Sequence, residues 1–352
     1  MNELNNYGIN LTDNFKIELK NKFFTILENT DNLLLDLKIF NFVEIKGGAD
    51  AIIFEFSVLC LRKNSNINMS AILRIFKDFD SNQRSIDEFR ILTRLHQTSI
   101  NVPKPFFIGL NDSALKKPYF VMEKINGILL SKALNTINKD ELPIICENVI
   151  SEVSKLHNLK WKDHLPWLGQ NIGKSETKSI IKSELEIAQN LIKQYNISEL
   201  HPVIEWLKNN QKFVSESNIM PIHGDLNPLN IIIKPDGFIT IIDWSNIKLS
   251  DYRMDLALLI LTTNIESSNN TTIHLTSAYE KINKIKVQNI DYFIILSNIN
   301  ILTMVYSSLA DRNYTEASIG LKVFEFKPYI NMITEYVYSI TGIKLETLRK
   351  QN

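Results

Sequence analysis

The sequence has only two cysteines and no net charge, and each of these features argues against certain classes of function. Only Cys60 and Cys146 occur among its 352 residues, and each lies in an apolar run. They are predicted to be buried free thiols in a reducing compartment, and no Cys/His cluster has the spacing of a zinc site. Basic and acidic residues both number 39, so the formal net charge is zero. We therefore expect neither nucleic acid nor a membrane surface as a partner.

Signals for targeting and for membrane insertion are weak as well. The first seven residues have neither the basic nor the apolar region of a signal peptide, so we expect a cytoplasmic protein. Residues 292–310 carry no charge and could span a bilayer by length. They are nevertheless predicted to form a buried core helix, because they contain Ser297, Asn298, Asn300, Thr303, Ser307 and Ser308. With 44% apolar and 22% charged residues, the chain has the composition of a globular protein of one large or two ordinary domains.

Residues 222–244 gather polar side chains at the open end of a predicted β-hairpin. Two apolar runs, 231–233 and 238–242, flank a Pro-Asp-Gly turn at 235–237. Asn230 enters the first run, and Asp243 follows the second. Asp225 lies on the loop just before them, so the three side chains are expected to lie close together.

These residue types suit phosphoryl transfer. Mg²⁺ prefers oxygen ligands and is usually held by one or two carboxylates together with substrate phosphates. Asn230 and Asp243 could supply the protein oxygens, and Asp225 could accept the proton of an attacking hydroxyl. An ordinary hairpin with polar ends is the alternative, but it does not account for the full set of spacings.

The same stretch resembles a known pattern. His-Gly-Asp-Leu-Asn-Pro-Leu-Asn at 223–230 fits the kinase catalytic-loop form H-x-D-L-x-x-x-N, and Asp243 stands where D-F-G has its metal-binding Asp. Because Gly follows the His and Ile-Asp-Trp replaces Asp-Phe-Gly, it is more similar to the aminoglycoside phosphotransferase and choline kinase superfamily than to protein kinases. Asp-Leu-Ala at 255–257 agrees with that family. The resemblance implies that His223 supports the loop and that Asp255 hydrogen-bonds its backbone.

Upstream, the pattern predicts a helical segment over residues 1–40, strands at 42–46, 51–61 and 69–76, a helix at 81–96, and strands at 105–110 and 118–123. By the resemblance, Gly47 and Gly48 cover the nucleotide phosphates, although the loop lacks the full G-x-G-x-x-G. Arg74 occupies the slot of the phosphate-binding lysine, and Glu88 is placed to pair with it. A plain hairpin turn, a surface arginine and a solvated glutamate are the respective alternatives.

The resemblance also implies an inter-lobe segment in which backbone groups of Met122, Glu123 and Lys124 bind the purine edge. Helices are predicted to dominate afterwards, with a structural His157 and a helix stop at Gly342. The predicted fold class is α+β: a two-lobed protein-kinase-like fold with a small antiparallel-sheet N-lobe with one helix and a larger, mainly helical C-lobe. The N-lobe spans 1–125, with an N-terminal helix and the nucleotide-binding strands, and the catalytic and acceptor-binding lobe spans 126–352.

The sequence therefore predicts a Mg²⁺-dependent phosphotransferase that uses ATP or GTP and phosphorylates a hydroxyl of a small molecule. A non-catalytic nucleotide-binding module is one alternative, although all expected catalytic side chains are present. A protein kinase is disfavoured, since no A-P-E element follows Asp243 and residues 243–255 leave no room for an activation loop. A purely structural helical protein would leave the polar hairpin mouth unexplained. Acidic residues after 257 are interleaved with lysines, so the acceptor is left open between antibiotic and metabolite.

Overall fold

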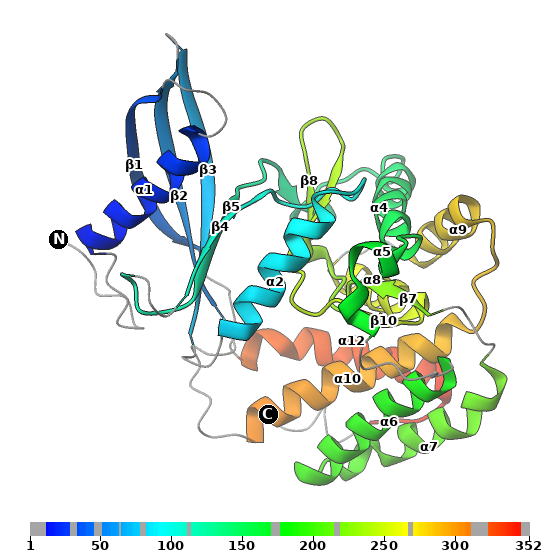
Figure 1. The fold of residues 1–352 in the computed structure, drawn as a ribbon. Helices are drawn as coiled ribbons and strands as arrows, with labels where there is room; N and C mark the ends of the chain where they lie inside the picture. The colour runs from blue at the N-terminus through cyan, green and yellow to red at the C-terminus, as the bar shows by residue number, and fades with distance from the viewer. Residues whose placement is uncertain are drawn as a thin grey trace. The chain divides into compact units, whose positions relative to one another are not determined.

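The computed structural model describes residues 12–28, 34–45, 51–62, 65–77, 82–110, 114–169, 177–214, 219–266, 270–310 and 323–345. The chain divides into two compact units. The first unit consists of Met1–Gln97 and Val102–Ile125, and the second of Thr98–Asn101 and Asn126–Asn352. Both units are drawn in Figure 1, where many of the helices and strands are labelled.

In its described residues, the first unit consists of an antiparallel sheet and two helices. In chain order it contains α1 (Asp13–Glu28), β1 (Leu34–Ile45), β2 (Ala51–Arg62), β3 (Ser65–Phe76), α2 (Asn82–Leu95), β4 (Pro105–Gly109) and β5 (Tyr119–Glu123). The strand order is β1-β2-β3-β5-β4, and every neighbouring pair is antiparallel. β3 therefore lies at the centre of the sheet.

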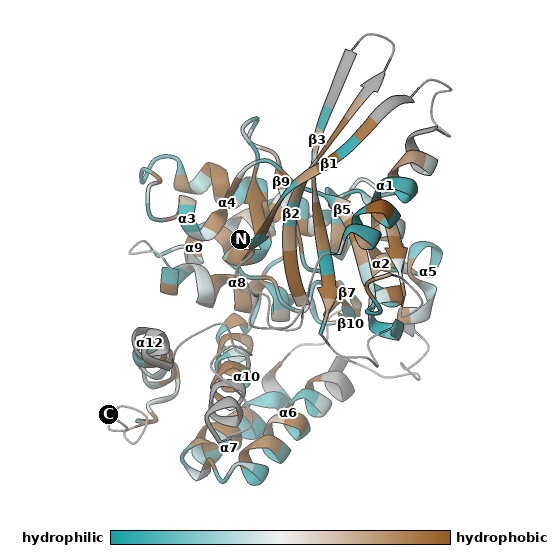
Figure 2. Cartoon of the chain, turned by 90° about the vertical axis from the view of Figure 1, so that its left-hand side faces the viewer, coloured by the Kyte–Doolittle hydropathy of each residue, from teal (hydrophilic) through white to brown (hydrophobic). Residues whose placement is uncertain are grey.

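Alternating burial explains why these strands form. Along β2 every second side chain is buried, and Figure 2 shows this strand largely in the colour of apolar residues. α1 supplies the opposite side of the core through Phe15, Leu19 and Phe23, which recur every fourth residue and are fully buried. The Phe23 ring meets Phe56 edge to face, with 5.9 Å between centroids. Burial of each such side chain contributes about 1.5–3 kcal/mol to folding.

The predicted first helix is too long and the predicted first strand too short. α1 ends at Glu28, and β1 already begins at Leu34, not at residue 42. Leu37 and Ile39 face the core while Lys38 and Phe40 are exposed, so this stretch has the two-residue period of a strand. The third strand likewise begins four residues earlier than predicted, at Ser65. The helix predicted at 81–96 is present as α2.

Helices dominate the second unit. They are α3 (Leu130–Ala133), α4 (Leu142–His157), α5 (Trp161–His164), α6 (Thr177–Gln194), α7 (His201–Asn210), α8 (Tyr252–Glu266), α9 (Thr272–Asn283), α10 (Ile290–Ala310) and α12 (Val323–Thr341), with short 3₁₀ helices η2 (Pro166–Gly169), η3 (Ser198–Leu200), η4 (Gln211–Phe213) and η5 (Pro228–Asn230). β6 (Ile128–Leu129), β8 (Ile231–Ile233) and β9 (Ile239–Ile241) form one small sheet. β7 (Met220–Ile222) and β10 (Lys248–Ser250) form another.

Two predictions for the C-terminal helices are confirmed. α10 is a core helix, with Phe293 to Leu296 almost fully buried. None of the helices in the described ranges is long and apolar enough to cross a membrane. α12 ends at Thr341, and Gly342 follows with a φ of 73°, the left-handed conformation of a helix cap.

Candidate active site

The loop that joins β7 to β8 holds the Asp225 carboxylate in one position. Asn227 Nδ2 donates to Asp225 Oδ1 (3.0 Å), and Asn230 Nδ2 donates to Oδ2 (3.0 Å). Both amides also donate to the Asp225 carbonyl oxygen, at 3.2 and 2.9 Å. Asn227 in turn accepts the Leu229 N–H (2.9 Å) at the start of η5. The carboxylate is thus fixed by two amides that are themselves fixed by the loop.

His223 ties this loop to the residue that precedes Asp243. The side chain is fully buried, and Nε2 lies 3.0 Å from the Ile242 carbonyl oxygen. A carbonyl only accepts, so Nε2 carries the proton and Nδ1 accepts the Asp225 N–H (3.3 Å). In a second hydrogen bond between these segments, the Ile242 N–H donates to the Asn230 carbonyl oxygen (2.9 Å). Asn230 and Ile242 are therefore hydrogen-bonded to each other at the open end of the hairpin.

Asp243 has an uncommon backbone conformation at this mouth. Its φ is 61°, which few residues other than glycine adopt and which costs on the order of 1–3 kcal/mol. Ser245 Oγ donates to Asp243 Oδ1 (2.9 Å). Trp244 is fully buried and donates through Nε1 to the Ile241 carbonyl (3.0 Å). The anchored Trp244 and the Ser245 hydroxyl hold the strained residue in place.

Asp255, at the start of α8, binds the backbone of the same loop. Its Oδ2 accepts the His223 N–H (2.7 Å), and its Oδ1 accepts the Gly224 N–H (2.9 Å). His157 Nε2 lies 3.2 Å from Oδ2. Burial by itself raises the pKa of Asp255, but the hydrogen bonds from the His157 side chain and from the His223 backbone help to hold it below the ordinary value. Asp255 is therefore an ionised acceptor inside the protein.

Gly224 is required where the loop approaches the segment after Asp243. Its φ is 79°, and a Cβ added there would lie 2.2 Å from the Asn246 carbonyl oxygen. Any side chain would collide with backbone that cannot yield easily. The Gly of the His-Gly-Asp triplet is thus explained by close packing.

Two carboxylates influence each other at the site. Burial raises the pKa of Asp225 above its ordinary value, and the charge of Asp243 adds to the rise. The amides of Asn227 and Asn230 act in the opposite direction through their hydrogen bonds. A cation bound beside the two carboxylates would relieve their repulsion.

The oxygen atoms at the hairpin mouth fit a magnesium ion. Asn230 uses Nδ2 for Asp225, and no hydrogen bond found within the described ranges uses its Oδ1. That leaves one amide oxygen and the Asp243 carboxylate as hard donors, which is the protein share that Mg²⁺ takes at phosphate-containing sites. The described part of the chain holds no cluster of three or more His, Cys, Asp or Glu side chains suited to a metal ion.

The first unit contains the ion pair that the sequence predicts. Arg74 on β3 and Glu88 on α2 are both buried, and Arg74 Nη1 lies 3.4 Å from Glu88 Oε1. The neighbouring Asp87 accepts a hydrogen bond from Gln83 on the helix surface instead (2.9 Å). Gly47 and Gly48, predicted to cover the nucleotide phosphates, lie outside the described residues.

The segment predicted to bind a purine uses two of its amides within the first unit. The Glu123 N–H donates to the Lys104 carbonyl (2.8 Å), and the Lys124 N–H donates to the Ser70 carbonyl (3.1 Å). The Lys124 side chain pairs with Glu55. Purine binding through this segment would therefore use groups other than these two amides.

Sequence reasoning missed several side chains that position the site. Asn227 was identifiable, because an Asn before a Pro is typical of a helix N-cap. Ser245 had no distinguishing local pattern. Tyr279, whose hydroxyl lies 2.9 Å from His157 Nδ1, comes from α9 and gave no signal in the sequence.

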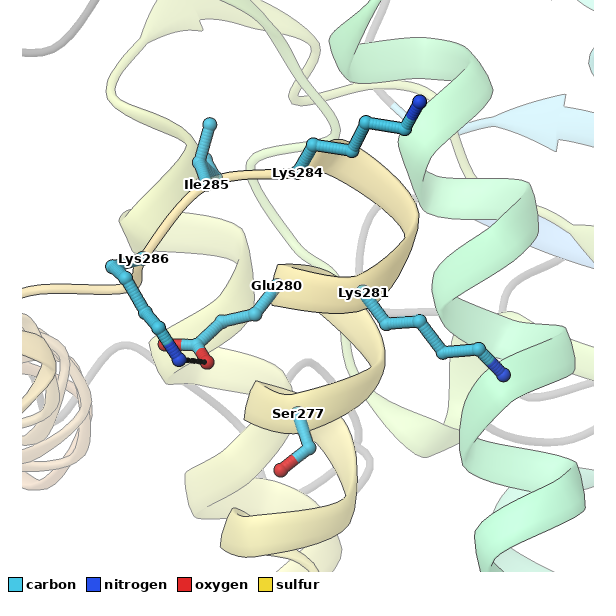
Figure 3. A pocket seen from close by; sticks show the side chains of 6 residues that line it. All are labelled: Ser277, Glu280, Lys281, Lys284, Ile285 and Lys286. Carbon is cyan, nitrogen blue, oxygen red and sulfur yellow. Dashed lines mark hydrogen bonds and ion pairs between the residues drawn. The ribbon is translucent and has the colours of Figure 1, made fainter.

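A cavity of about 410 Å³ at the end of α9 is separate from these residues. It is lined by Ser277, Glu280, Lys281, Lys284, Ile285 and Lys286, none of them predicted for the site. Figure 3 shows Glu280 meeting Lys286, a 2.7 Å ion pair, while Lys281 points away from them. Lys281 pairs instead with Glu147 (2.7 Å). Two of the three lysines are thus neutralised locally.

Sequence comparison finds one family. The sequence model of the phosphotransferase enzyme family matches residues 56–281. Acyl-CoA dehydrogenase family member 11 from Pongo abelii and its counterpart from Homo sapiens are each 26% identical over 174 residues. That alignment covers 48% of this chain and 22% of each relative, so the chain spans about a fifth of the length of the curated relatives it matches.

Structure comparison finds the same fold in solved proteins. A protein of Ralstonia eutropha JMP134 described as an aminoglycoside phosphotransferase has a TM-score of 0.62 at 13% identity, covering 91% of this chain and 98% of that one. A thermostable mutant of aminoglycoside phosphotransferase APH(4)-Ia has a TM-score of 0.57 at 13% identity, covering 92% and 99%. The streptomycin–ATP complex of APH(2")-IIa has a TM-score of 0.53 at 11% identity, covering 96% and 99%. The fold class expected from the sequence is confirmed: α+β, with an antiparallel-sheet unit and a larger helical unit.

Proposed function

The chain belongs to the phosphotransferase enzyme family, and on that premise we propose that it transfers the γ-phosphoryl group of ATP or GTP to a hydroxyl of a small molecule. One observation carries the proposal. The Asp225 carboxylate is locked by two amides on a loop whose neighbouring oxygens, on Asn230 and Asp243, fit Mg²⁺. A site built this way supplies position and charge, and phosphoryl transfer needs little else from a protein.

Asp225 orients the acceptor hydroxyl and takes its proton. The hydrogen bonds from Asn227 and Asn230, one to each carboxylate oxygen, hold the Asp225 side chain in place. A loose transition state does not require the hydroxyl to be deprotonated before attack, so an Asp suffices as the base. His223 and Asp255 act on the loop and not on the substrate.

Asn230 Oδ1 and the Asp243 carboxylate hold the metal in this proposal. Bound Mg²⁺ would neutralise charge on the nucleotide phosphates. Ser245 orients one Asp243 oxygen, and the Ile242–Asn230 backbone bond keeps the two ligand residues together. In the first unit, Glu88 sets the direction of Arg74, whose guanidinium binds nucleotide phosphate.

The relatives support a nucleotide donor and a small acceptor. A variant of APH(4)-Ia has been solved in a ternary complex with ADP and hygromycin B, and APH(2")-IIa with ATP and streptomycin. Sequence identities of 11–14% to these structures show a shared fold and not a shared acceptor. The acceptor of this chain is therefore proposed only as a hydroxylated small molecule.

Replacement of Asp225 is the first test. We expect Asp225→Asn to lower kcat on the order of 100- to 10,000-fold, because the base is lost, and to leave nucleotide affinity nearly unchanged. The assay is phosphate transfer from Mg-ATP and Mg-GTP to aminoglycosides, macrolides, choline, ethanolamine, homoserine and sugars. Asp236→Asn, an exposed change in the hairpin turn, is the matched control. Nucleotide affinity that falls in parallel with the rate would contradict the base role.

Replacement of Asp243 tests the metal site. We expect Asp243→Ala to abolish Mg²⁺-dependent nucleotide binding, since the only carboxylate in the proposed ligand set is removed. Isothermal titration with and without Mg²⁺ measures it, with Asp236→Ala as control. Unchanged Mg-ATP affinity would remove Asp243 from the ligand set. Tight nucleotide binding by the wild type without transfer to any acceptor would favour the non-catalytic binding module.

A further inference from the structure

A buried chain of polar groups runs from α9 to the catalytic loop. Tyr279 on α9 and His157 on α4 are both almost fully buried. The Tyr279 hydroxyl lies 2.9 Å from His157 Nδ1, and His157 Nε2 lies 3.2 Å from Asp255 Oδ2. The same Asp255 oxygen accepts the His223 N–H (2.7 Å). Three helices therefore meet at groups that end on the loop carrying Asp225.

The direction of these hydrogen bonds follows from the chemistry of the two groups that flank His157, the Tyr279 hydroxyl and the Asp255 carboxylate. Asp255 is ionised and can only accept, so its hydrogen bond with His157 exists only while His157 Nε2 carries a proton. Burial raises the pKa of Tyr279 far above its ordinary value, so its hydroxyl stays protonated and is able to donate. In a neutral imidazole with its proton on Nε2, Nδ1 is an acceptor, so the Tyr279 hydroxyl donates to Nδ1 and stabilises that tautomer.

We propose that Tyr279 is a positioning residue for phosphoryl transfer, acting by fixing the tautomer of His157 so that Asp255 holds the catalytic loop. The inference rests on the proposed function. With the proton on Nδ1 instead, the Nε2 lone pair would face a buried carboxylate oxygen and repel it. Asp255 would then shift, and its bonds to the His223 and Gly224 amides would loosen.

The packing around Tyr279 allows the hydroxyl to be removed alone. Its ring stacks on Tyr252, with centroids 4.8 Å apart and planes 3° from parallel. Phenylalanine at 279 keeps that stack and the buried volume. Tyr279→Phe therefore removes one hydrogen-bond donor and little else, and Tyr252→Phe is the matched control, since its hydroxyl is outside the chain of bonds.

The kinetic test separates position from binding. We expect Tyr279→Phe to lower kcat about 10-fold, the scale of one lost hydrogen bond, and to leave KM for nucleotide and acceptor within about twofold. Tyr252→Phe should be within about twofold of wild type in both. Unchanged kcat in Tyr279→Phe, with an active wild type, would overturn the inference and leave the proposed function standing.

A double variant tests whether Tyr279 acts through His157. Glutamine at 157 offers an amide donor to Asp255 and has no tautomers. In a His157→Gln background, adding Tyr279→Phe should therefore change kcat less than twofold. Losses that multiply would mean that Tyr279 acts independently of His157, and would overturn the inference.

The tautomer itself is observable without turnover. The chain has six histidines, so the ¹⁵N ring signals of His157 are assigned by their loss in His157→Gln. We expect the Nε2–H form in the wild type and in Tyr252→Phe, and a mixture of both tautomers in Tyr279→Phe. An unchanged Nε2–H signal in Tyr279→Phe would overturn the inference whether or not any acceptor is phosphorylated.

Discussion

At the scale of single residues, the orientation of Asp243 depends on a hydroxyl two positions further on. Ser245 Oγ donates to Asp243 Oδ1, while the backbone of Asp243 is held in a left-handed conformation. A carboxylate aimed by an outer partner presents a defined lone pair to a cation. If Asp243 holds Mg²⁺ as proposed, the affinity for the metal would therefore depend on Ser245 as well, although Ser245 is not in the proposed ligand set.

We expect Ser245→Ala to raise the Mg²⁺ concentration for half-maximal activity roughly 10-fold, the usual effect of losing a partner of a metal ligand. Ser245→Thr keeps the hydroxyl and should remain close to wild type. A magnesium titration of the transfer reaction at saturating nucleotide measures both variants. An unchanged magnesium requirement in Ser245→Ala would show that Asp243 needs no help from its neighbour.

The site was predictable where its residues share one local pattern. The hairpin register pairs Ile231 with Ile241, so Asn230 and residue 242 had to lie together at its mouth. The Arg74–Glu88 pair was likewise predictable, because Glu88 lies on the helix face that carries Leu92 and Leu95. The contact between Tyr279 and His157 joins residues far apart in the sequence, and no hydrophobic periodicity or sequence motif predicts such a pair.

At the scale of elements, a buried glutamate of α4 holds the segment that follows α2. Glu152 is almost fully buried, and its carboxylate accepts the backbone N–H of Asn101 and the Asn101 Nδ2 (2.9 Å). Lys155 Nζ donates to the same carboxylate (2.7 Å). The Asn101 carbonyl then accepts the Ile241 N–H (3.2 Å), so α4 is linked to β9.

Two glutamates on α4 make a matched pair for testing this link. We expect Glu152→Ala to destabilise the second unit by about 1–3 kcal/mol, because the partly buried donors of Asn101 lose their acceptor. Glu147→Ala breaks only the exposed pair with Lys281 and should cost under about 1 kcal/mol.

Urea unfolding followed by tryptophan fluorescence measures both variants. All four tryptophans, Trp161, Trp167, Trp206 and Trp244, belong to the second unit, so the signal reports on that unit. Equal midpoints for the two variants would mean that the Glu152 contacts contribute no more than an exposed ion pair.

Most helices and strands could be predicted from hydrophobic periodicity and turn residues, and the start of β1 is the exception. The sequence pattern predicts helix up to residue 40, because Phe15, Leu19 and Phe23 recur with a helical period just before β1. The alternation of Leu37 and Ile39 with exposed neighbours was too short to outweigh that pattern. What decides the strand is its pairing with β2, in which Lys38 lies opposite Leu59.

At the scale of the whole molecule, each unit contains one cysteine. Cys60 lies on β2 and Cys146 on α4, and both are buried free thiols, as the sequence predicted. Burial raises the pKa of Cys60, and it raises the pKa of Cys146 to about 12. The thiolate is the reactive form, so burial suppresses reactivity both by access and by protonation.

We expect the native protein at pH 8 to react with a thiol reagent such as Ellman's at neither cysteine on the timescale of a free thiol. For Cys146 the raised pKa alone slows the reaction about 1000-fold. The variants Cys60→Ser and Cys146→Ser assign the signal to one unit each, and urea should restore both reactions. Rapid labelling of Cys146 in the native state would contradict its burial.

The division of the chain constrains how such a protein can be cut or recombined. Thr98–Asn101 belongs to the second unit, although the residues on both sides belong to the first, so the backbone crosses between the units three times. A fragment that ends at Ile125 would carry Asn101 away from Glu152. A split-reporter design or a domain graft that cuts only at that junction therefore loses the hydrogen bonds between Asn101 and Glu152. An exchange that preserves both units must move residues 98–101 together with the helical unit.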